Sequence, residues 1–176
     1  MQRPSLVSVP EQPEALGKRQ ERKREVSAEI RFIADAMLGR LARWMRLLGF
    51  DTLYYPGIKD SDLLKCALRE RRVILTKDTH FLRMKNLENV YFVHAERPVA
   101  QIAEVCGAFK ITSPGVARCG SCNGVLHEIT GKERVHDLVP EYVFLSASAF
   151  TECSSCGKVY WEGTHLRRFR ELLAIK

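Results

Sequence analysis

Two pairs of cysteines, each separated by two residues, are the side chains of this chain best suited to binding a metal. The pairs are Cys119-Gly-Ser-Cys122 and Cys153-Ser-Ser-Cys156. A Cys-x-x-Cys turn presents two sulfurs to one ion, and two such turns complete a tetrahedral four-thiolate site for Zn²⁺. Because four thiolates leave no position open for water or substrate, we expect this zinc to be structural. Asn123-Gly124 and Gly157 follow the turns and tolerate the backbone angles that such turns require.

The same cysteines could instead form two disulfides or remain unrelated buried thiols. The metal site is favoured because the paired spacing recurs and nothing suggests export: the first 27 residues are polar and charged and lack the apolar segment of a secretory signal. No stretch approaches the roughly 18 apolar residues of a membrane span. We therefore expect a cytoplasmic protein with no membrane partner. Cys66 and Cys106 lie in helical patterns and are expected to be core residues.

Three aspartates stand where a second metal site could form. Asp35 ends the first expected strand, Asp78 follows the third, and Asp62 lies in the first turn of an intervening helix. The carboxyl ends of parallel strands meet at one edge of a sheet, where open α/β folds place their ligands, so we expect these carboxylates to converge. Their mutual repulsion predicts a neutralising Mg²⁺ or Mn²⁺, which could activate a water for phosphodiester cleavage. Each aspartate could instead cap the helix or turn that follows it.

The elements that must position these side chains follow from an alternation of short apolar strands and amphipathic helices. This alternation predicts an α/β fold with a parallel sheet flanked by helices, over residues 29–113. The expected strands are 30–34, 51–55, 73–76 and 90–94, and the expected helices are 36–48, 60–72 and 98–109. A small β-rich zinc ribbon with a basic helix at its end is expected over 114–176, and the thirty residues between the cysteine pairs can hold a β-hairpin or two. Residues 1–28 are expected to form a disordered charged arm.

Basic side chains suggest a polyanionic partner. The 176 residues include 28 Lys and Arg against 21 Asp and Glu, a formal net charge of +7. Arg40, Arg43 and Arg46 recur every three residues on the helix that follows Asp35, away from its apolar face. They could form an ordinary solvated surface or, beside an acidic metal cluster, a row that contacts phosphates. We expect Arg40, one turn from Asp35, to contact substrate, and Arg43 next.

A second group of basic and aromatic residues lies near the C-terminus. Tyr160 and Trp161 precede His165 and Arg167. Such a combination suits single-stranded or looped RNA, through stacking and phosphate contacts. The two aromatic rings could equally pack the ribbon against the sheet domain. His165 could contact RNA, donate a proton or make a structural hydrogen bond.

Several segments resemble one known family. The run 32–51 (FIADAMLGRLARWMRLLGFD) resembles the opening of the Mut-seven C-terminal RNase domain family, and 73–78 (VILTKD) resembles its second hallmark. Residues 118–124 and 153–165 resemble its zinc-ribbon half. This family is a branch of the PIN-like nucleases, which carry acidic metal-binding clusters on a parallel sheet. The resemblance therefore implies a PIN-like nuclease domain fused to a zinc ribbon.

The resemblance also implies roles for individual residues. Asp35 and Asp78 match acidic metal ligands, and Thr76 matches the hydroxyl that supports them. The acid of the middle helix matches Asp62, although Asp60 could be aligned instead.

Together these observations predict a metal-dependent ribonuclease, with structural zinc, catalytic Mg²⁺ or Mn²⁺, and RNA held by the basic helix and the ribbon. A fourth acid of PIN-like domains has only a weak counterpart, Glu96, which leaves open whether one or two metals bind. The alternatives are a non-catalytic RNA- or ribosome-binding zinc-ribbon protein and a protein-interaction scaffold. PIN-like domains often pair, so a homodimer also stays open.

Overall fold

The computed structural model describes residues 30–84, 87–111, 115–161 and 163. The expected arm at 1–28 and the expected basic helix after Gly163, with His165 and Arg167, lie outside these residues. Among the described residues, none of the helices combines the length and apolar composition that crossing a membrane would need.

A four-stranded parallel sheet confirms the predicted α/β class. Its strands are β1 (Phe32–Ala34), β2 (Thr52–Tyr54), β3 (Val73–Thr76) and β4 (Val90–Phe92). Their spatial order is β2-β1-β3-β4, so the chain crosses over the sheet between consecutive strands. In register, Ala34 lies beside Leu75, and Thr76 lies beside Phe92, so the chain segments that follow β1, β3 and β4 leave from the same edge.

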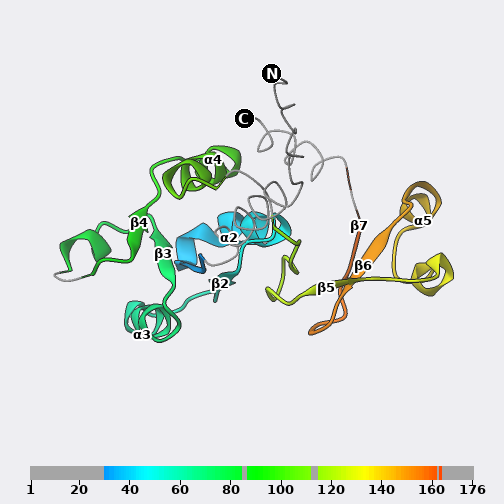
Figure 1. Ribbon diagram of the computed structural model, residues 1–176, viewed down its shortest axis with the longest axis horizontal. Helices are drawn as coiled ribbons and strands as arrows, with labels where there is room; N and C mark the ends of the chain where they lie inside the picture. The colour runs from blue at the N-terminus through cyan, green and yellow to red at the C-terminus, as the bar shows by residue number, and fades with distance from the viewer. Residues whose placement is uncertain (1–29, 85–86, 112–114, 162, 164–176) are drawn as a thin grey trace, which may run out of the picture.

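Helices cover both faces of this sheet (Figure 1). Helices α2 (Gly39–Leu47) and α4 (Pro98–Ala108) pack together on one face, and α3 (Asp60–Glu70) lies on the other. The alternating side chains of β1 divide the apolar core accordingly, because Phe32 and Ala34 join the cluster under α2 and α4 whereas Ile33 joins the cluster under α3. Cys66 and Cys106 are buried in these two clusters, as predicted.

The helix expected at 36–48 is divided in two. A single 3₁₀ turn, η1 (Ala36–Leu38), precedes α2. The Asp35 carboxylate caps this turn by accepting a hydrogen bond from the Ala36 N–H. The Tyr54 hydroxyl, at the end of β2, donates to the Ala36 carbonyl over 3.2 Å. The turn is therefore tied to the sheet, and it fixes where the chain leaves β1.

The zinc-ribbon half contains a second, antiparallel sheet of β5 (Leu126–Glu128), β6 (Phe150–Cys153) and β7 (Val159–Trp161), in that order. The antiparallel pair of β5 and β6 occupies the segment between the cysteine pairs, which has room for a β-hairpin or two. The long connection between β5 and β6 forms a 3₁₀ turn, η3 (Lys132–Val135), and a short helix, α5 (Glu141–Ser146). Val135, Val139 and Val143 pack with Phe150 in a small separate core.

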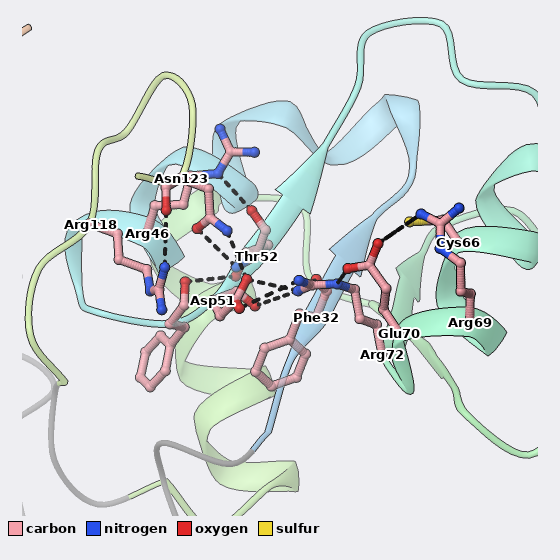
Figure 2. A network of polar contacts seen from close by, with 11 residues as sticks. Phe32, Arg46, Asp51, Thr52, Cys66, Arg69, Glu70, Arg72, Arg118 and Asn123 are labelled. Atoms are coloured by element: carbon pink, nitrogen blue, oxygen red, sulfur yellow. Dashed lines mark hydrogen bonds and ion pairs between the residues drawn. The ribbon is translucent and has the colours of Figure 1, made fainter. Parts of the chain in front are cut away.

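A buried polar network joins the two halves of the chain (Figure 2). The Asp51 carboxylate, at the start of β2, accepts hydrogen bonds from Arg72 Nη1 at 2.7 Å and from Asn123 Nδ2 at 2.7 Å. Asn123 belongs to the first cysteine turn, and its side-chain oxygen also accepts a hydrogen bond from the Thr52 N–H. We call Asp51, Arg72, Asn123 and Arg46 the junction.

The position of Arg46 differs from the expected row of solvent-exposed arginines. Its side chain is buried, with a residue exposure of 3%. Nε donates to the Thr52 carbonyl over 2.7 Å, and Nη1 donates to the carbonyls of Ser121 at 3.0 Å and Gly120 at 3.3 Å. A buried guanidinium is tolerated when its donors are satisfied, and here backbone carbonyls of the first cysteine turn satisfy them. Arg46 therefore holds the ribbon rather than facing solvent.

The junction predicts a loss of stability in acid. Although partial burial opposes it, hydrogen bonds from Arg72 and Asn123 lower the pKa of Asp51. Hydrogen bonds from Arg69 and Arg72 lower the pKa of Glu70 to about 2. Carboxyl groups with lowered pKa values stabilise the fold above their unfolded pKa of about 4, and this contribution disappears as the pH falls towards their folded pKa. Urea midpoints should therefore decrease between about pH 4.5 and pH 2.

Asp51→Asn tests the same interaction directly. Removing the charge leaves the buried Arg72 with a weaker partner, and we expect a loss of about 2 kcal/mol in the free energy of unfolding at pH 7. The variant should also show a shallower decrease in acid than the unaltered protein. Exposed Asp137→Asn is the control. Identical acid profiles for both aspartate variants would contradict the role given to Asp51.

Candidate functional site

Asp35 and Asp78 are linked through one buried hydroxyl at the carboxyl edge of the parallel sheet. Thr76 Oγ1 donates to Asp35 Oδ2 over 2.8 Å and accepts a hydrogen bond from the Asp78 N–H at 2.9 Å. Thr76 is fully buried and Asp35 is 7% exposed. Because the hydroxyl oxygen accepts from Asp78, its single hydrogen is directed to Asp35. The sequence-predicted grouping of Asp35, Thr76 and Asp78 is thus present in the structure.

Asp78 stands in a tight turn after β3. Its Oδ1 accepts a hydrogen bond from the His80 N–H at 2.8 Å, which holds the carboxylate close to the backbone. In the part of the chain that the structure describes, its other carboxylate oxygen has no hydrogen-bond partner. The side chain is half-buried, so this oxygen is available to a cation or to a substrate. Oxygen donors of this kind are the ligands that Mg²⁺ and Mn²⁺ prefer.

Asp62 lies apart from this pair. It occupies the first turn of α3 with Asp60, and both residues are exposed. Its Oδ1 contacts Lys65 Nζ at 3.3 Å in a solvent-exposed ion pair. Among the described residues, the three aspartates do not form a compact ligand group comparable to that of the four cysteines. The role of Asp62 as a third ligand stays a prediction.

Two basic side chains, from segments that follow β1 and β3, line one pocket. Arg40, in the first turn of α2, is exposed and makes no ion pair with the described residues. Lys77 lies between Thr76 and Asp78 in the chain and pairs with Glu96. Arg40, Lys77 and Glu96 all line a pocket of about 460 Å³. Glu96, the weak candidate for a fourth acid, therefore has a lysine partner.

The segment that carries Glu96 is held by a carboxylate. Glu104, on α4, accepts hydrogen bonds from the N–H groups of His94 at 2.9 Å and Ala95 at 2.8 Å. Although burial opposes it, these N–H groups lower the pKa of Glu104. The chain after β4 is thereby fixed against α4, and with it the wall of the pocket.

The four cysteines meet at one point. Cys119 and Cys156 have their sulfurs 3.5 Å apart, Cys122 and Cys153 3.4 Å apart, and all four sulfurs lie within 4.8 Å of one another. A disulfide bond is about 2.05 Å long, so these thiols are not bonded to each other. A tetrahedral Zn²⁺ with Zn–S bonds of about 2.3 Å separates its sulfurs by about 3.8 Å. The donor set therefore fits zinc.

The two cysteine turns share one backbone geometry. In each turn, the residue after the second cysteine donates to the carbonyl of the first cysteine: Asn123 to Cys119 and Gly157 to Cys153, both at 2.9 Å. Asn123 has a φ of 69° and Gly157 a φ of 68°, in the left-handed region expected from the sequence. Asparagine tolerates this region and, unlike glycine, supplies the amide that reaches Asp51.

Electrostatics around the sulfurs favour a bound cation. Although burial opposes it, hydrogen bonds from Tyr160 and from the Cys122 and Ser121 N–H groups lower the pKa of Cys119. Although the Gly124 N–H opposes it, burial and the neighbouring cysteines raise the pKa of Cys122. Four crowded thiols cannot all ionise without a compensating charge, and a divalent metal supplies it.

The remaining sequence-predicted residues have different positions. Arg43 is exposed on α2, and its side chain lies next to Gly120 of the first cysteine turn. The Tyr160 hydroxyl contacts Cys119 Sγ at 3.1 Å, so this ring supports the cysteine site. Trp161 is 36% exposed. Sequence analysis missed the contribution of Tyr160 to the site, because an aromatic residue near a cysteine pair carries no specific pattern.

A comparison with protein families now gives the class of protein. The model of the Mut7-C RNAse domain matches residues 30–173. The chain therefore belongs to the Mut7-C RNAse domain family, as its sequence motifs predicted, and a ribonuclease-type role follows from this membership. Comparisons with curated proteins and with solved structures found no match.

The close approach of the two cysteine turns predicts a sensitive glycine. A Cβ atom on Gly124 would lie 2.7 Å from Ser155 Oγ and 2.9 Å from Cys153 Sγ. Gly124→Ala should therefore spread the turns and reduce bound zinc, measured by mass spectrometry of the native protein, from one ion per chain to a minor fraction.

Gly107→Ala is the matched control, because a Cβ on Gly107 meets nothing within 4 Å. It should keep its metal. Full zinc occupancy in Gly124→Ala would show that the four cysteines do not bind metal in the observed arrangement.

Proposed function

We propose that this protein is a metal-dependent ribonuclease that hydrolyses phosphodiester bonds at the carboxyl edge of its parallel sheet. The observation that carries the proposal is the hydrogen-bonded chain from Asp35 through Thr76 to Asp78 at that edge. Family membership supports the reaction class. The position of a sheet's carboxyl edge supports the choice of site.

Asp35 and Asp78 would hold Mg²⁺ or Mn²⁺, and Asp62 would complete the set from the first turn of α3. Such an ion supplies a nucleophilic water and stabilises charge on the phosphate oxygens. Thr76 is a positioning residue: its hydroxyl fixes the rotamer of Asp35 and the backbone of Asp78 at the same time.

Arg40 would bind a phosphate of the RNA. It lies in the first turn of α2, which directly follows the 3₁₀ turn that Asp35 caps. Arg43, one turn further along the exposed side of α2, lies against Gly120 of the ribbon. An RNA strand that follows these two cations would pass from the acidic edge towards the ribbon. His165 and Arg167, beyond the described residues, are proposed as further RNA contacts.

The four cysteines would bind a structural zinc. With four thiolates the site carries a net charge of about −2, and the buried guanidinium of Arg46 offsets part of it from the neighbouring helix. The zinc would stabilise residues 114–176 as a ribbon and keep that ribbon attached to the nuclease domain through Asn123.

Loss of the acidic pair should abolish cleavage. End-labelled single-stranded, hairpin and tRNA-like RNAs are incubated with Mg²⁺, Mn²⁺ or EDTA, and products are separated on denaturing gels. We expect cleavage with metal only, and a decrease of at least about 100-fold in Asp78→Asn and Asp35→Asn. Exposed Asp137→Asn is the matched control and should cut normally.

Products that persist in both variants would overturn the assignment of the site. RNA that binds in a salt-sensitive way but stays intact with every metal would instead favour a non-catalytic binding module.

Thr76→Val separates positioning from metal binding. Valine keeps the volume of the side chain but removes the hydroxyl, so Asp35 and Asp78 lose their shared partner. We expect activity about 10–100-fold lower, with partial recovery at raised Mn²⁺ concentration. Asp62→Asn, in the same assay, should raise the Mn²⁺ concentration needed for half-maximal rate. A Thr76→Val protein that is folded and fully active at low Mn²⁺ would contradict the role of the hydroxyl.

A further inference from the structure

The pocket that Arg40 and Lys77 line also contains apolar and amide side chains that the proposed hydrolysis does not use. Its volume is about 460 Å³, within the range of sites for small organic ligands. Two segments form its walls. The turn η1 and the start of α2 contribute Met37, Leu38, Arg40 and Leu41, and the other wall contains Lys77, Glu96, Pro98 and Gln101.

One part of the wall is apolar and open to solvent. Met37 is 71% exposed, although its neighbours Leu38 and Leu41 are buried. Met37 and the partly exposed Pro98 therefore offer an apolar surface to whatever occupies the pocket. A flexible, polarisable thioether suits contact with a flat aromatic ring.

Gln101 adds a directed polar group. The residue is buried, with 6% exposure, and its Nε2 donates to the Ala95 carbonyl at 3.0 Å and to the Glu96 carbonyl at 3.4 Å. Those bonds fix the orientation of the amide and leave Oε1 without a partner among the described residues. Since no fully buried side-chain oxygen or nitrogen described in this structure lacks a partner, Oε1 must remain accessible. The accessible space that Gln101 lines is the pocket.

The charges of the wall favour an anionic ligand. Arg40 is exposed and unpaired in the described part of the chain, whereas Lys77 pairs with Glu96. The wall thus has an excess of one positive charge. Lys77 stands between Thr76 and Asp78 in the chain, so one residue of the pocket wall is covalently joined to both members of the proposed site of hydrolysis.

We propose that this pocket binds one nucleotide of the RNA substrate, adjacent to the phosphate that is cut. The base packs on Met37 and Pro98, an N–H of the base donates to Gln101 Oε1, and Arg40 pairs with the nucleotide's phosphate. The proposal rests on the proposed ribonuclease function, because it takes the ligand class from that substrate. It adds a base-recognising position that the acidic pair cannot provide.

The test is a two-dimensional NMR titration of the full chain carrying Asp78→Asn, without added Mg²⁺ or Mn²⁺, so that cleavage does not contribute and the proposed structural zinc stays in place. The four ribonucleoside 5′-monophosphates are added separately, with ribose 5-phosphate and inorganic phosphate as base-free probes. We expect the side-chain amide of Gln101 to shift with nucleotides, and at least one nucleotide to bind about tenfold more tightly than ribose 5-phosphate.

Two further variants separate the contributions. Arg40→Gln should weaken every phosphate-bearing probe about tenfold, whereas Gln101→Met should weaken the preferred nucleotide and leave ribose 5-phosphate unchanged. Arg134→Gln, an exposed arginine of the ribbon, is the matched control and should change neither affinity. Met37→Ala gives a second measure of base contact that does not disturb the hydrogen bonds of Gln101.

The pocket proposal would be overturned if the nucleotides bound no more tightly than ribose 5-phosphate and if Gln101→Met and Met37→Ala left their affinities unchanged. The gel assay distinguishes this from failure of the proposed function. Metal-dependent cleavage without base-dependent binding would refute the pocket alone. Base-dependent binding in a protein that never cuts RNA would refute the hydrolysis and support the pocket.

Discussion

The Asp51 carboxylate is the constraint on which the arrangement of the two halves depends. It lies at the start of β2 and accepts hydrogen bonds from two distant residues. One is Arg72, which precedes β3, and the other is Asn123, which belongs to the first cysteine turn. A half-buried carboxylate in this position is stable only while both donors are present. The charge of Asp51 is therefore compensated both by Arg72 of the sheet half and by Asn123 of the cysteine half. Neither half alone contains all the groups of this hydrogen-bonded network.

The junction and the proposed metal site lie at opposite ends of the parallel sheet. The junction occupies the edge where β2 and β3 begin, and the Asp35–Thr76–Asp78 group lies where β1 and β3 end. Strand β2 connects the ends: Thr52 contacts the ribbon, and Tyr54 holds the turn after Asp35. The first cysteine turn therefore lies at the opposite end of β2 from the turn that follows Asp35.

Features fixed by local pattern were predicted well from the sequence. Strand β3 has the predicted bounds, and topology alone placed Asp35 and Asp78 at a common edge. Hydrogen bonds between side chains and residues distant in the sequence were not predictable. Nothing in the spacing of Arg46 distinguishes it from Arg40, since its burial depends on carbonyls more than seventy residues away in the chain. The orientation of Gln101 likewise depends on carbonyls of the preceding loop, which periodicity does not describe.

Helix α2 carries three regularly spaced arginines that lie in two different environments. Residues three apart on a helix are rotated by about 60° relative to one another, so Arg40, Arg43 and Arg46 turn progressively around the axis rather than sharing one face. The first two remain in solvent, and the third turns inward where the ribbon covers the end of the helix. A phosphate-binding surface and a buried structural contact can thus follow each other within two turns. The helix that would guide RNA from the acidic edge therefore also holds the first cysteine turn, through Arg46.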